Sequence, residues 1–371
     1  MITIVLLKLL RHLVTFLLLL TGTVSCFIDQ LPEPTGLYSV GTTTYFLYDH
    51  TRIEQYAQTP NTLRQVIVHL YYPANPDTHH KHAQYQEEAI ILYLIQKGIN
   101  IDHYRNIKTN AFYQAPIAND QSSFPVIIFS PGFGCSCRDY SSLLEELASH
   151  GYIIAALDHP YTTITVNQAG NVIPTTPIDT INTNQHDLMC ATLATWIADT
   201  NFIVDQLKQI NMQDPQNIVT NRLKLDKLGI FGHSLGGAVA LHICALNHLI
   251  KAAVNIDGAL LNGDGTFMTN GLDKPYMILV HDYPELYQSN PEAVHFKTKA
   301  KTATQAYIRH STNDTYHISL NRAEHFTFSD APLLSRQKPS GEFTFIEPRL
   351  GINITRFLLV CFFNHYIKST T

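Results

Sequence analysis

A strand, a sharp turn and a helix follow one another directly over residues 226–246, and this succession constrains the fold more than any other segment. The turn reads G-H-S-L-G at residues 232–236, the pattern of a nucleophile elbow. In such a turn the side chain of Ser234 stands at the tip of a sheet, and glycines remove the Cβ atoms that clash where strand and helix nearly touch. The bare pattern also occurs by chance, whereas its strand–turn–helix context is specific. The segment therefore predicts a serine nucleophile at a strand end.

Apolar strands alternate with helices along the rest of the chain, which predicts a mostly parallel central sheet flanked by helices. The expected strands cover residues 64–72, 125–130, 152–157, the segment before Gly232, 251–256, 276–280 and 305–309, and the expected helices cover about 140–150, 187–210, 237–246 and 352–367. Hydrophobic content of 45% with 15% charged residues fits a large folded core.

The organisation along the chain predicts one domain over residues 30–371. A polar insertion at about 75–123 contains one apolar helical piece, residues 89–95. This piece predicts a membrane contact, a lid over an apolar acyl pocket or an ordinary buried helix. Residues 357–363 are too short to span a bilayer, so we expect a packed helix there. We find no linker that divides the domain.

The amino terminus predicts a signal peptide over residues 1–25. Two basic residues precede an apolar run at 13–20, and small residues follow before Cys26. The run is about half of the ~20 residues that a spanning helix needs. We therefore expect export, with a lipid-modified Cys26 and membrane association as the less favoured alternative. The formal net charge of −5 and the lack of a basic run argue against nucleic acid as a partner, and oligomeric state stays open.

A serine hydroxyl becomes an effective nucleophile when a histidine base, oriented by a carboxylate, takes its proton. In the α/β-hydrolase fold the chain order is serine, acid, histidine. Asp257 stands just past the strand that follows the nucleophile helix, Asp282 stands past the next strand, the more usual acid position, and Asp264 lies in a glycine-rich loop. The residues by themselves leave all three open and favour Asp257.

The base is expected to be His325, which lies in a loop after the last expected strand. His310 and His317 are nearer to expected strands and are interpreted as surface or packing residues. His233 belongs to the elbow itself, where it supports the turn and cannot reach round to take the proton of the serine.

The negative charge that develops on the substrate oxygen needs preorganised N–H donors. One is expected from the backbone of Leu235, the residue after the nucleophile, and the other from Phe133 in the P-G-F-G turn at residues 131–134. This chemistry needs no metal and no cofactor, and we expect neither.

Several segments resemble the platelet-activating factor acetylhydrolases of the plasma and intracellular type II kind, within the α/β-hydrolases. The matching segments are F-S-P-G-F-G at 129–134, L-A-S-H-G-Y-I-I-A-A-L-D-H at 147–159, D-x-x-F-x-x-D-x-L at 199–207, G-H-S-L-G-G at 232–237, V-N-I-D-G at 254–258 and E-H-F-T-F at 324–328. The resemblance implies that Asp257 is the acid. It also supports Ser234, His325 and the two backbone amides in their roles.

The resemblance implies a serine esterase that removes a short or oxidised sn-2 acyl group from phospholipids, a phospholipase A2 type of reaction. Pro131 stands where family members usually have histidine, and Pro-Gly-aromatic is similar to secreted polyester and triglyceride hydrolases of cutinase type. A broad-specificity esterase or lipase is therefore the enzymatic alternative. A catalytically inactive hydrolase fold that binds lipid is the alternative from another class.

Overall fold

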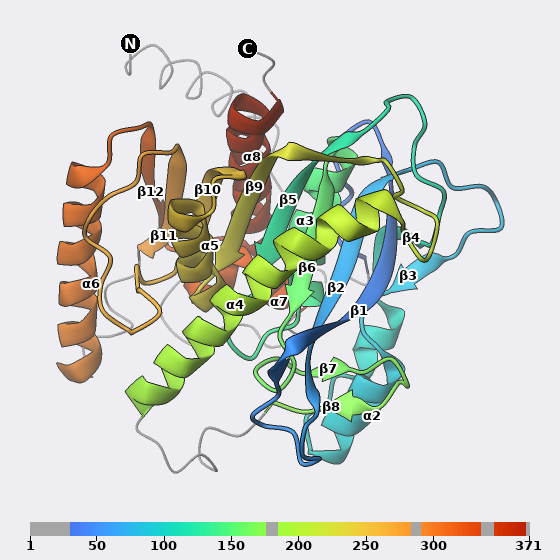
Figure 1. Cartoon of the computed structure of the whole chain (residues 1–371), viewed down its shortest axis with the longest axis horizontal. Coiled ribbons are helices and arrows are strands. Elements are labelled where there is room, and N and C mark those ends of the chain that lie inside the picture. Colours follow the sequence, from blue (N-terminus) through green and yellow to red (C-terminus); the bar gives the residue numbers. More distant parts are fainter. Residues whose placement is uncertain (1–29, 176–184, 283–290, 335–344, 369–371) are drawn as a thin grey trace.

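The computed structural model describes residues 30–175, 185–282, 291–334 and 345–368. The expected signal peptide and Cys26 lie outside these ranges. Within them, ten strands form one large sheet, and a separate two-stranded ribbon lies near the carboxyl ends of the central strands (Figure 1).

The large sheet is parallel at its centre and along one side. Its strands are β1 (Ser39–Ile53), β2 (Leu63–Ala74), β3 (His82–Gln84), β4 (Lys108–Tyr113), β5 (Phe124–Ser130), β6 (Ile153–Asp158), β9 (Leu223–His233), β10 (Ile250–Ile256), β11 (Tyr276–Asp282) and β12 (Thr315–Asn321), and the ribbon pairs β7 (Thr165–Val166) with β8 (Val172–Ile173). The spatial order is β12-β11-β10-β9-β5-β6-β2-β1-β4-β3. Strands from β12 to β6 are parallel neighbours, whereas β2 runs antiparallel to both β6 and β1. The expectation of a mostly parallel sheet is confirmed.

Helices cover both faces of the sheet (Figure 1). They are α2 (Glu88–Gln96), α3 (Ser141–Ser149), α4 (Gln185–Met212), α5 (Leu235–Leu246), α6 (Pro291–His310), α7 (Ala331–Leu334) and α8 (Pro348–Phe363). The central strands are apolar on both sides, because alternate side chains enter opposite cores. On β5, Val126 and Ile128 belong to the core under α4 and α5, while Ile127 and Phe129 belong to the core under α3 and α8. Burial of such a side chain contributes about 1.5–3 kcal/mol.

The segment expected as an insertion contributes to the edge of the sheet. It forms β3, α2, a 3₁₀ turn (Asp102–Asn106) and β4, and β4 pairs with β1. The helical piece expected at 89–95 is α2, which buries Ile90 and Ile91 and lies against the β7–β8 ribbon. The opposite side of α2 leaves Leu92 and Ile95 exposed.

One expected strand is wrong. Residues 305–309 lie in the last turns of α6, and the final strand is β12. Ala303 and Tyr307, four residues apart, are the buried face of this helix. The expected closing helix is α8, which continues into a π-helical turn (Asn364–Lys368). Among the described residues, Pro348–Lys368 is a stretch long and apolar enough to cross a membrane, but half of its apolar window is buried within the protein and it packs against α3.

Candidate active site

The elbow forms where β9 ends at His233 and α5 begins at Leu235. Ser234, between them, has φ 54° and ψ −120°, a region that costs a non-glycine residue about 1–3 kcal/mol. Its amide donates to the Ile256 carbonyl at 2.8 Å, which fixes the strained residue to the neighbouring strand. A Cβ atom on Gly232 would lie 2.1 Å from the Gly236 carbonyl oxygen, so only glycine allows this approach of strand and helix.

Asp257 and His325 meet beside this elbow. The Nδ1 atom of His325 lies 2.5 Å from Oδ2 of Asp257, the geometry of a strong charge-assisted hydrogen bond. Asp257 follows β10 directly, has φ 55°, and donates its amide to the Leu279 carbonyl at 2.7 Å. Burial by itself raises the pKa of Asp257, but hydrogen bonds from His281 and His325 outweigh it and lower the pKa to about 2. The carboxylate is therefore ionised at any pH at which the protein is expected to work.

His325 is held by a 3₁₀ turn (His325–Phe328) that follows β12. The turn is closed at its start because the Glu324 amide donates to the Thr327 hydroxyl at 2.9 Å and the Thr327 amide donates to the Glu324 carbonyl at 3.0 Å. The His325 side chain is about one-third exposed, whereas that of Asp257 is 6% exposed. One face of the imidazole is thus open to a substrate while its Nδ1 side is enclosed.

His233 links three parts of the site. Its Nε2–H donates to the His325 carbonyl at 2.9 Å, and its Nδ1 accepts from the Tyr140 hydroxyl at 2.8 Å. The Tyr140 hydroxyl in turn accepts the Gly132 amide at 3.2 Å. Burial, followed by the nearby His325, lowers the pKa of His233 to about 3, so the ring stays neutral in this chain of bonds. Both nitrogens are engaged, as expected for a residue that supports the turn.

The backbone amides on either side of Phe133 already donate hydrogen bonds. Gly132 donates to Tyr140, Gly134 donates to the Thr162 carbonyl at 3.0 Å, and within the described residues the Phe133 amide has no acceptor. A Cβ atom on Gly132 would lie 3.5 Å from the Cβ atom of Ser234, which places this loop against the nucleophile. Leu235 is the first residue of α5, where an N–H has no intrahelical partner. Two donors are thus available next to Ser234.

The rival residues lie elsewhere. Asp282 is exposed at the end of β11, and Asp264 is exposed and accepts from the amide and hydroxyl of Thr266 at 2.9 and 2.6 Å. His310 donates to the Thr269 carbonyl at 2.7 Å, and His317 is exposed on β12. Within the described part of the chain, the carboxylate that bonds His325 is that of Asp257.

Sequence reasoning missed two neighbours of the site. Tyr140, in the 3₁₀ turn Cys137–Tyr140, bonds both the elbow and the P-G-F-G loop. His281, the penultimate residue of β11, places Nδ1 2.6 Å from the same Asp257 oxygen that His325 contacts. No local motif marks either residue, because each is brought to the site by the order of strands in the sheet.

A second Ser–His–Asp arrangement lies in the interior. The Ser130 hydroxyl is 3.1 Å from Nε2 of His159, and Nδ1 of His159 is 2.8 Å from Asp199. All three residues have no exposed surface, and Trp196 stacks on the His159 ring at 4.2 Å. Asp199 also forms an ion pair with the buried Arg64. A substrate cannot reach this group, so it is part of the core.

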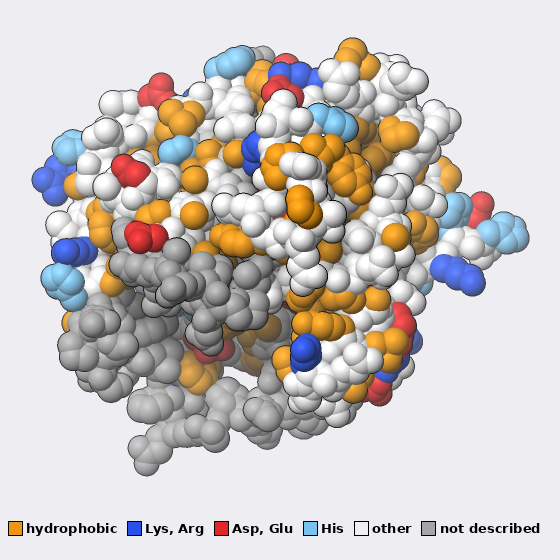
Figure 2. All heavy atoms as spheres, turned by 60° about the horizontal axis from the view of Figure 1, so that its bottom comes forward, with side chains coloured by type: hydrophobic (Ala, Val, Ile, Leu, Met, Phe, Trp, Pro, Cys, Tyr) orange, Lys and Arg blue, Asp and Glu red, His pale blue; other side chains and the backbone are white. Residues whose placement is uncertain are grey.

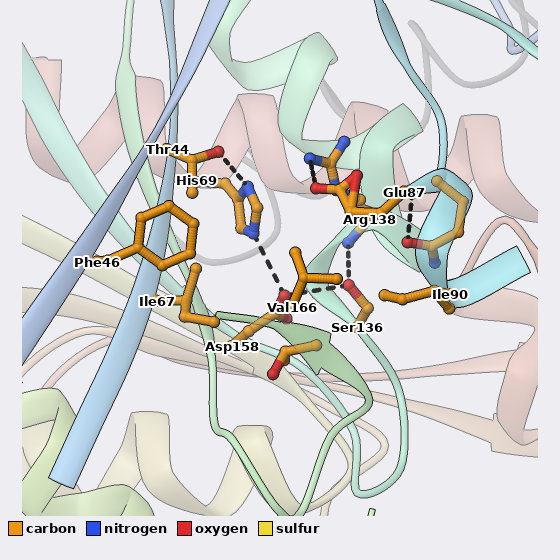
Figure 3. Close-up of a pocket in the computed structure, with 12 residues that line it drawn as sticks. Thr44, Phe46, Ile67, His69, Glu87, Ile90, Ser136, Arg138, Asp158 and Val166 are labelled. Atoms are coloured by element: carbon orange, nitrogen blue, oxygen red, sulfur yellow. Dashed lines mark hydrogen bonds and ion pairs between the residues drawn. The ribbon is translucent and has the colours of Figure 1, made fainter. Parts of the chain in front are cut away.

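A small pocket lies between β1, β2, α2 and the ribbon (Figure 3). Phe46, Ile67 and Ile90 supply its apolar lining, and His69 and Asp158 supply polar groups. Ser234, Asp257 and His325 are not among its lining residues. The face that carries the carboxyl ends of the strands shows a hollow, and hydrophobic side chains lie along the described part of its rim (Figure 2).

Two clusters bring potential metal ligands within 4.8 Å of one another: His69 with Cys137 and Asp158, and the His233, Asp257, His325 group. In the first, Asp158 accepts the Cys137 amide at 2.6 Å and faces His69 at 3.3 Å. In the second, the bonds described above already engage His233 and Asp257. Hydrogen bonding therefore accounts for the second cluster and for His69 and Asp158 of the first.

Comparisons with known proteins agree with this architecture. Residues 25–169 match the family model of platelet-activating factor acetylhydrolase, isoform II, and residues 105–266 match that of chlorophyllase. A probable 1-alkyl-2-acetylglycerophosphocholine esterase from Arthroderma benhamiae is 26% identical, with 60% of this chain and 52% of that protein covered. A platelet-activating factor acetylhydrolase from Bos taurus is 21% identical, with 62% and 55% covered.

More distant esterases are similar as well. Cutinase est1 from Thermobifida alba is 22% identical, with 56% of this chain and 55% of that protein covered. The chain spans about half the length of the curated relatives it matches. The solved structure of a ferulic acid esterase from Streptomyces cinnamoneus superposes with a TM-score of 0.74 at 22% identity, covering 92% of this chain and 94% of the other, which shows the fold. The chain has the α/β-hydrolase fold and, over part of its length, is similar to the platelet-activating factor acetylhydrolases.

Proposed function

We propose that the chain is a serine-dependent carboxylic ester hydrolase in which Ser234, His325 and Asp257 form the catalytic triad. The observation that carries this proposal is the 2.5 Å contact between His325 and Asp257 beside the strained elbow serine. Strain at a nucleophile elbow exposes the hydroxyl, and an ionised carboxylate on Nδ1 sets the imidazole tautomer that leaves Nε2 free to accept a proton.

The steps follow from these positions. The Ser234 hydroxyl attacks the ester carbonyl as His325 takes its proton, and the oxygen that becomes negative is bound by the amides of Phe133 and Leu235. Each such donor contributes about 2.7–4 kcal/mol to lowering the barrier. His325 then protonates the leaving alcohol. Water, activated by the same imidazole, hydrolyses the acyl-serine and releases the acid.

For the substrate we propose a phospholipid with a short or oxidised sn-2 acyl chain. Support comes from the match of residues 25–169 to the platelet-activating factor acetylhydrolase model, and from relatives named as acetylhydrolases and as a 1-alkyl-2-acetylglycerophosphocholine esterase. The exposed rings of Phe133 and Phe326, 37% and 46% accessible, flank the proposed oxyanion donor and base and offer apolar contacts to an acyl group. Large exposed aromatic side chains beside polar groups are typical of sites for amphipathic ligands.

The test compares hydrolysis of a 2-acetyl phospholipid with that of tributyrin by the purified protein, followed by a series of sn-2 acyl lengths. The proposal predicts a higher kcat/KM for the 2-acetyl phospholipid and a decline as the unoxidised chain lengthens. A strong preference for tributyrin contradicts the phospholipid assignment while leaving the triad intact.

A broad esterase of cutinase type is the second candidate. It is favoured by Pro131 before the oxyanion glycine and by the similarity to a cutinase. The same tributyrin result, together with release of soluble product from a short-chain polyester film, identifies this activity.

We further propose that the protein is exported and that the leader ends near residue 25. The basic, apolar and small-residue regions of the first 25 residues support this proposal. Amino-terminal sequencing of the mature protein from the extracellular fraction tests it. Recovery of the uncleaved chain from the cytosol contradicts export, and an acyl group on Cys26 indicates the lipidated alternative.

A further inference from the structure

Asp257 serves two imidazoles. Oδ2 lies 2.5 Å from Nδ1 of His325 and 2.6 Å from Nδ1 of His281, and Oδ1 accepts the His281 backbone amide at 3.2 Å. The His281 side chain is 11% exposed, and its ring lies edge-on to that of His325 with centroids 6.3 Å apart. A triad with one imidazole on the carboxylate satisfies the mechanism, so the second one needs its own explanation.

We propose that His281 is a positioning residue that fixes the Asp257 carboxylate and shares its negative charge with His325, so that activity extends to a lower pH. This inference rests on the proposed function of the triad. His281 does not contact the reacting atoms, so it acts through Asp257.

The direction follows from charge. A carboxylate oxygen that already accepts one N–H attracts a second imidazolium less strongly, so the shared contact weakens the attraction between Asp257 and a protonated His325. When acid adds a proton to His281, the like charge 6.3 Å away further disfavours a proton on His325. Loss of His281 removes both effects, so the acid limb of the activity profile should move to higher pH.

Other charged or titratable groups near this pair come from three elements. His233 at the end of β9 is buried, and its lowered pKa keeps it neutral. Asp282 is exposed beyond His281, and its carbonyl accepts the Arg322 amide at 3.4 Å. Glu324 precedes His325 in the 3₁₀ turn. A substitution of His281 leaves His233, Asp282 and Glu324 in place, so a change in the pH profile between variants reports on His281 itself.

The experiment measures kcat/KM for p-nitrophenyl butyrate between pH 4.5 and 9 with the full chain. His281→Asn keeps an N–H donor but cannot titrate, and His281→Phe keeps volume but offers neither donor nor charge. We expect the acid limb of His281→Phe to move upward by about one pH unit, a tenfold loss at a pH on that limb, with a smaller movement for His281→Asn. His317→Asn, an exposed histidine on the adjacent strand β12, is the matched control and should keep the wild-type profile.

If His281 only supports the fold, the pH profiles give a different result. Equal losses at every pH, with the acid limb of both His281 variants unmoved, overturn the proposal. An acid limb that moves downward also overturns it, because the sign of the coupling is then wrong.

A second readout does not depend on turnover. In Ser234→Ala protein, the imidazole NMR signals of His325 are titrated with and without His281→Phe. We expect His325 to take its proton at a higher pH in the double variant, and identical titrations contradict the inference. If Ser234→Ala instead keeps full esterase activity, the proposed triad fails, and that failure is distinct from any behaviour of His281.

Discussion

Replacing Asp257 with asparagine changes the charge that the site places on His325 while barely changing volume. Three N–H groups face this carboxylate: Nδ1–H of His325, Nδ1–H of His281 and the His281 amide. Asparagine offers one acceptor oxygen, and its NH2 group must face one of these donors. The imidazolium that forms as Ser234 attacks also loses its counter-charge.

The size of the loss can be worked from the geometry. With charge centres about 4 Å apart and an effective dielectric constant near 20, the imidazolium–carboxylate attraction is about 4 kcal/mol. At 1.36 kcal/mol per factor of ten, this is a loss of about 10³ in kcat/KM. The wrong imidazole tautomer increases the loss toward about 10⁴, as seen for the equivalent change in a serine protease.

The pKa of Asp257 gives a matching prediction for stability. The pKa falls from an ordinary 3.8 to about 2 on folding. This difference is worth roughly 2.4 kcal/mol at 1.36 kcal/mol per pKa unit. Because the folded pKa is the lower one, the stabilisation is fully present above about pH 4 and is lost as pH falls through 2. Urea unfolding of Asp257→Asn at neutral pH should therefore show a loss of up to about that size.

The assay is hydrolysis of a p-nitrophenyl ester, with Asp282→Asn as the matched control. Asp282 is exposed at the end of the next strand, so its variant should stay within about threefold of wild type. If Asp282→Asn loses activity and Asp257→Asn keeps it, the triad and the reasoning from charge are both wrong.

Three further predictions concern the supports of the site. A Cβ atom on Gly236 would lie 2.1 Å from the Ser130 carbonyl, so Gly236→Ala should lower the thermal midpoint and abolish activity together. Asp199→Leu removes one of the two carboxylates that pair with the buried Arg64, the other being Glu54, and should cost about 3 kcal/mol in urea unfolding. Burial raises the pKa of Asp199, but the attraction of Arg64 outweighs burial and lowers it, so wild-type stability should fall as pH drops below the ordinary value of 3.8. Phe133→Pro removes the free amide and should lower kcat by about 10²–10³, whereas Phe133→Ala, which keeps the amide, should lose far less at unchanged thermal stability.

The sequence indicates the site well where a motif is local. The elbow, the strand that precedes Asp257 and the loop of His325 all follow from short patterns, because a sharp turn between an apolar strand and an apolar helix needs those glycines. The His325–Asp257 contact that the spacing favoured is present in the structure. Their catalytic roles stay a prediction.

The edge of the sheet was harder to predict. β12 pairs on one side with β11. Five of its seven residues are Thr, Tyr, His, Ser or Asn, and all five are partly or fully exposed. The strand therefore lacks the apolar run by which a buried strand is recognised. The short apolar run within residues 305–309 instead lies in α6, where Tyr307 is the buried residue of the run. Helical spacing between Ala303 and Tyr307 was the available signal.

The neighbours of Asp257 depend on which way a strand faces. Side chains alternate along β11, so His281 and Asp282 point to opposite sides. His281 therefore reaches Asp257, and Asp282, the more usual acid position, is exposed. A single residue of register decides this outcome, and the sequence does not specify the register.

Reaction of the folded protein with a fluorophosphonate probe, followed by peptide mass spectrometry, tests the central claim most directly. The account predicts a covalent adduct on Ser234, no adduct in Ser234→Ala, and slow labelling of Asp257→Asn. Ser130, with its own buried histidine and aspartate, should stay unlabelled because it has no exposed surface. Folded wild-type protein that resists the probe, or an adduct on any serine other than Ser234, contradicts the account.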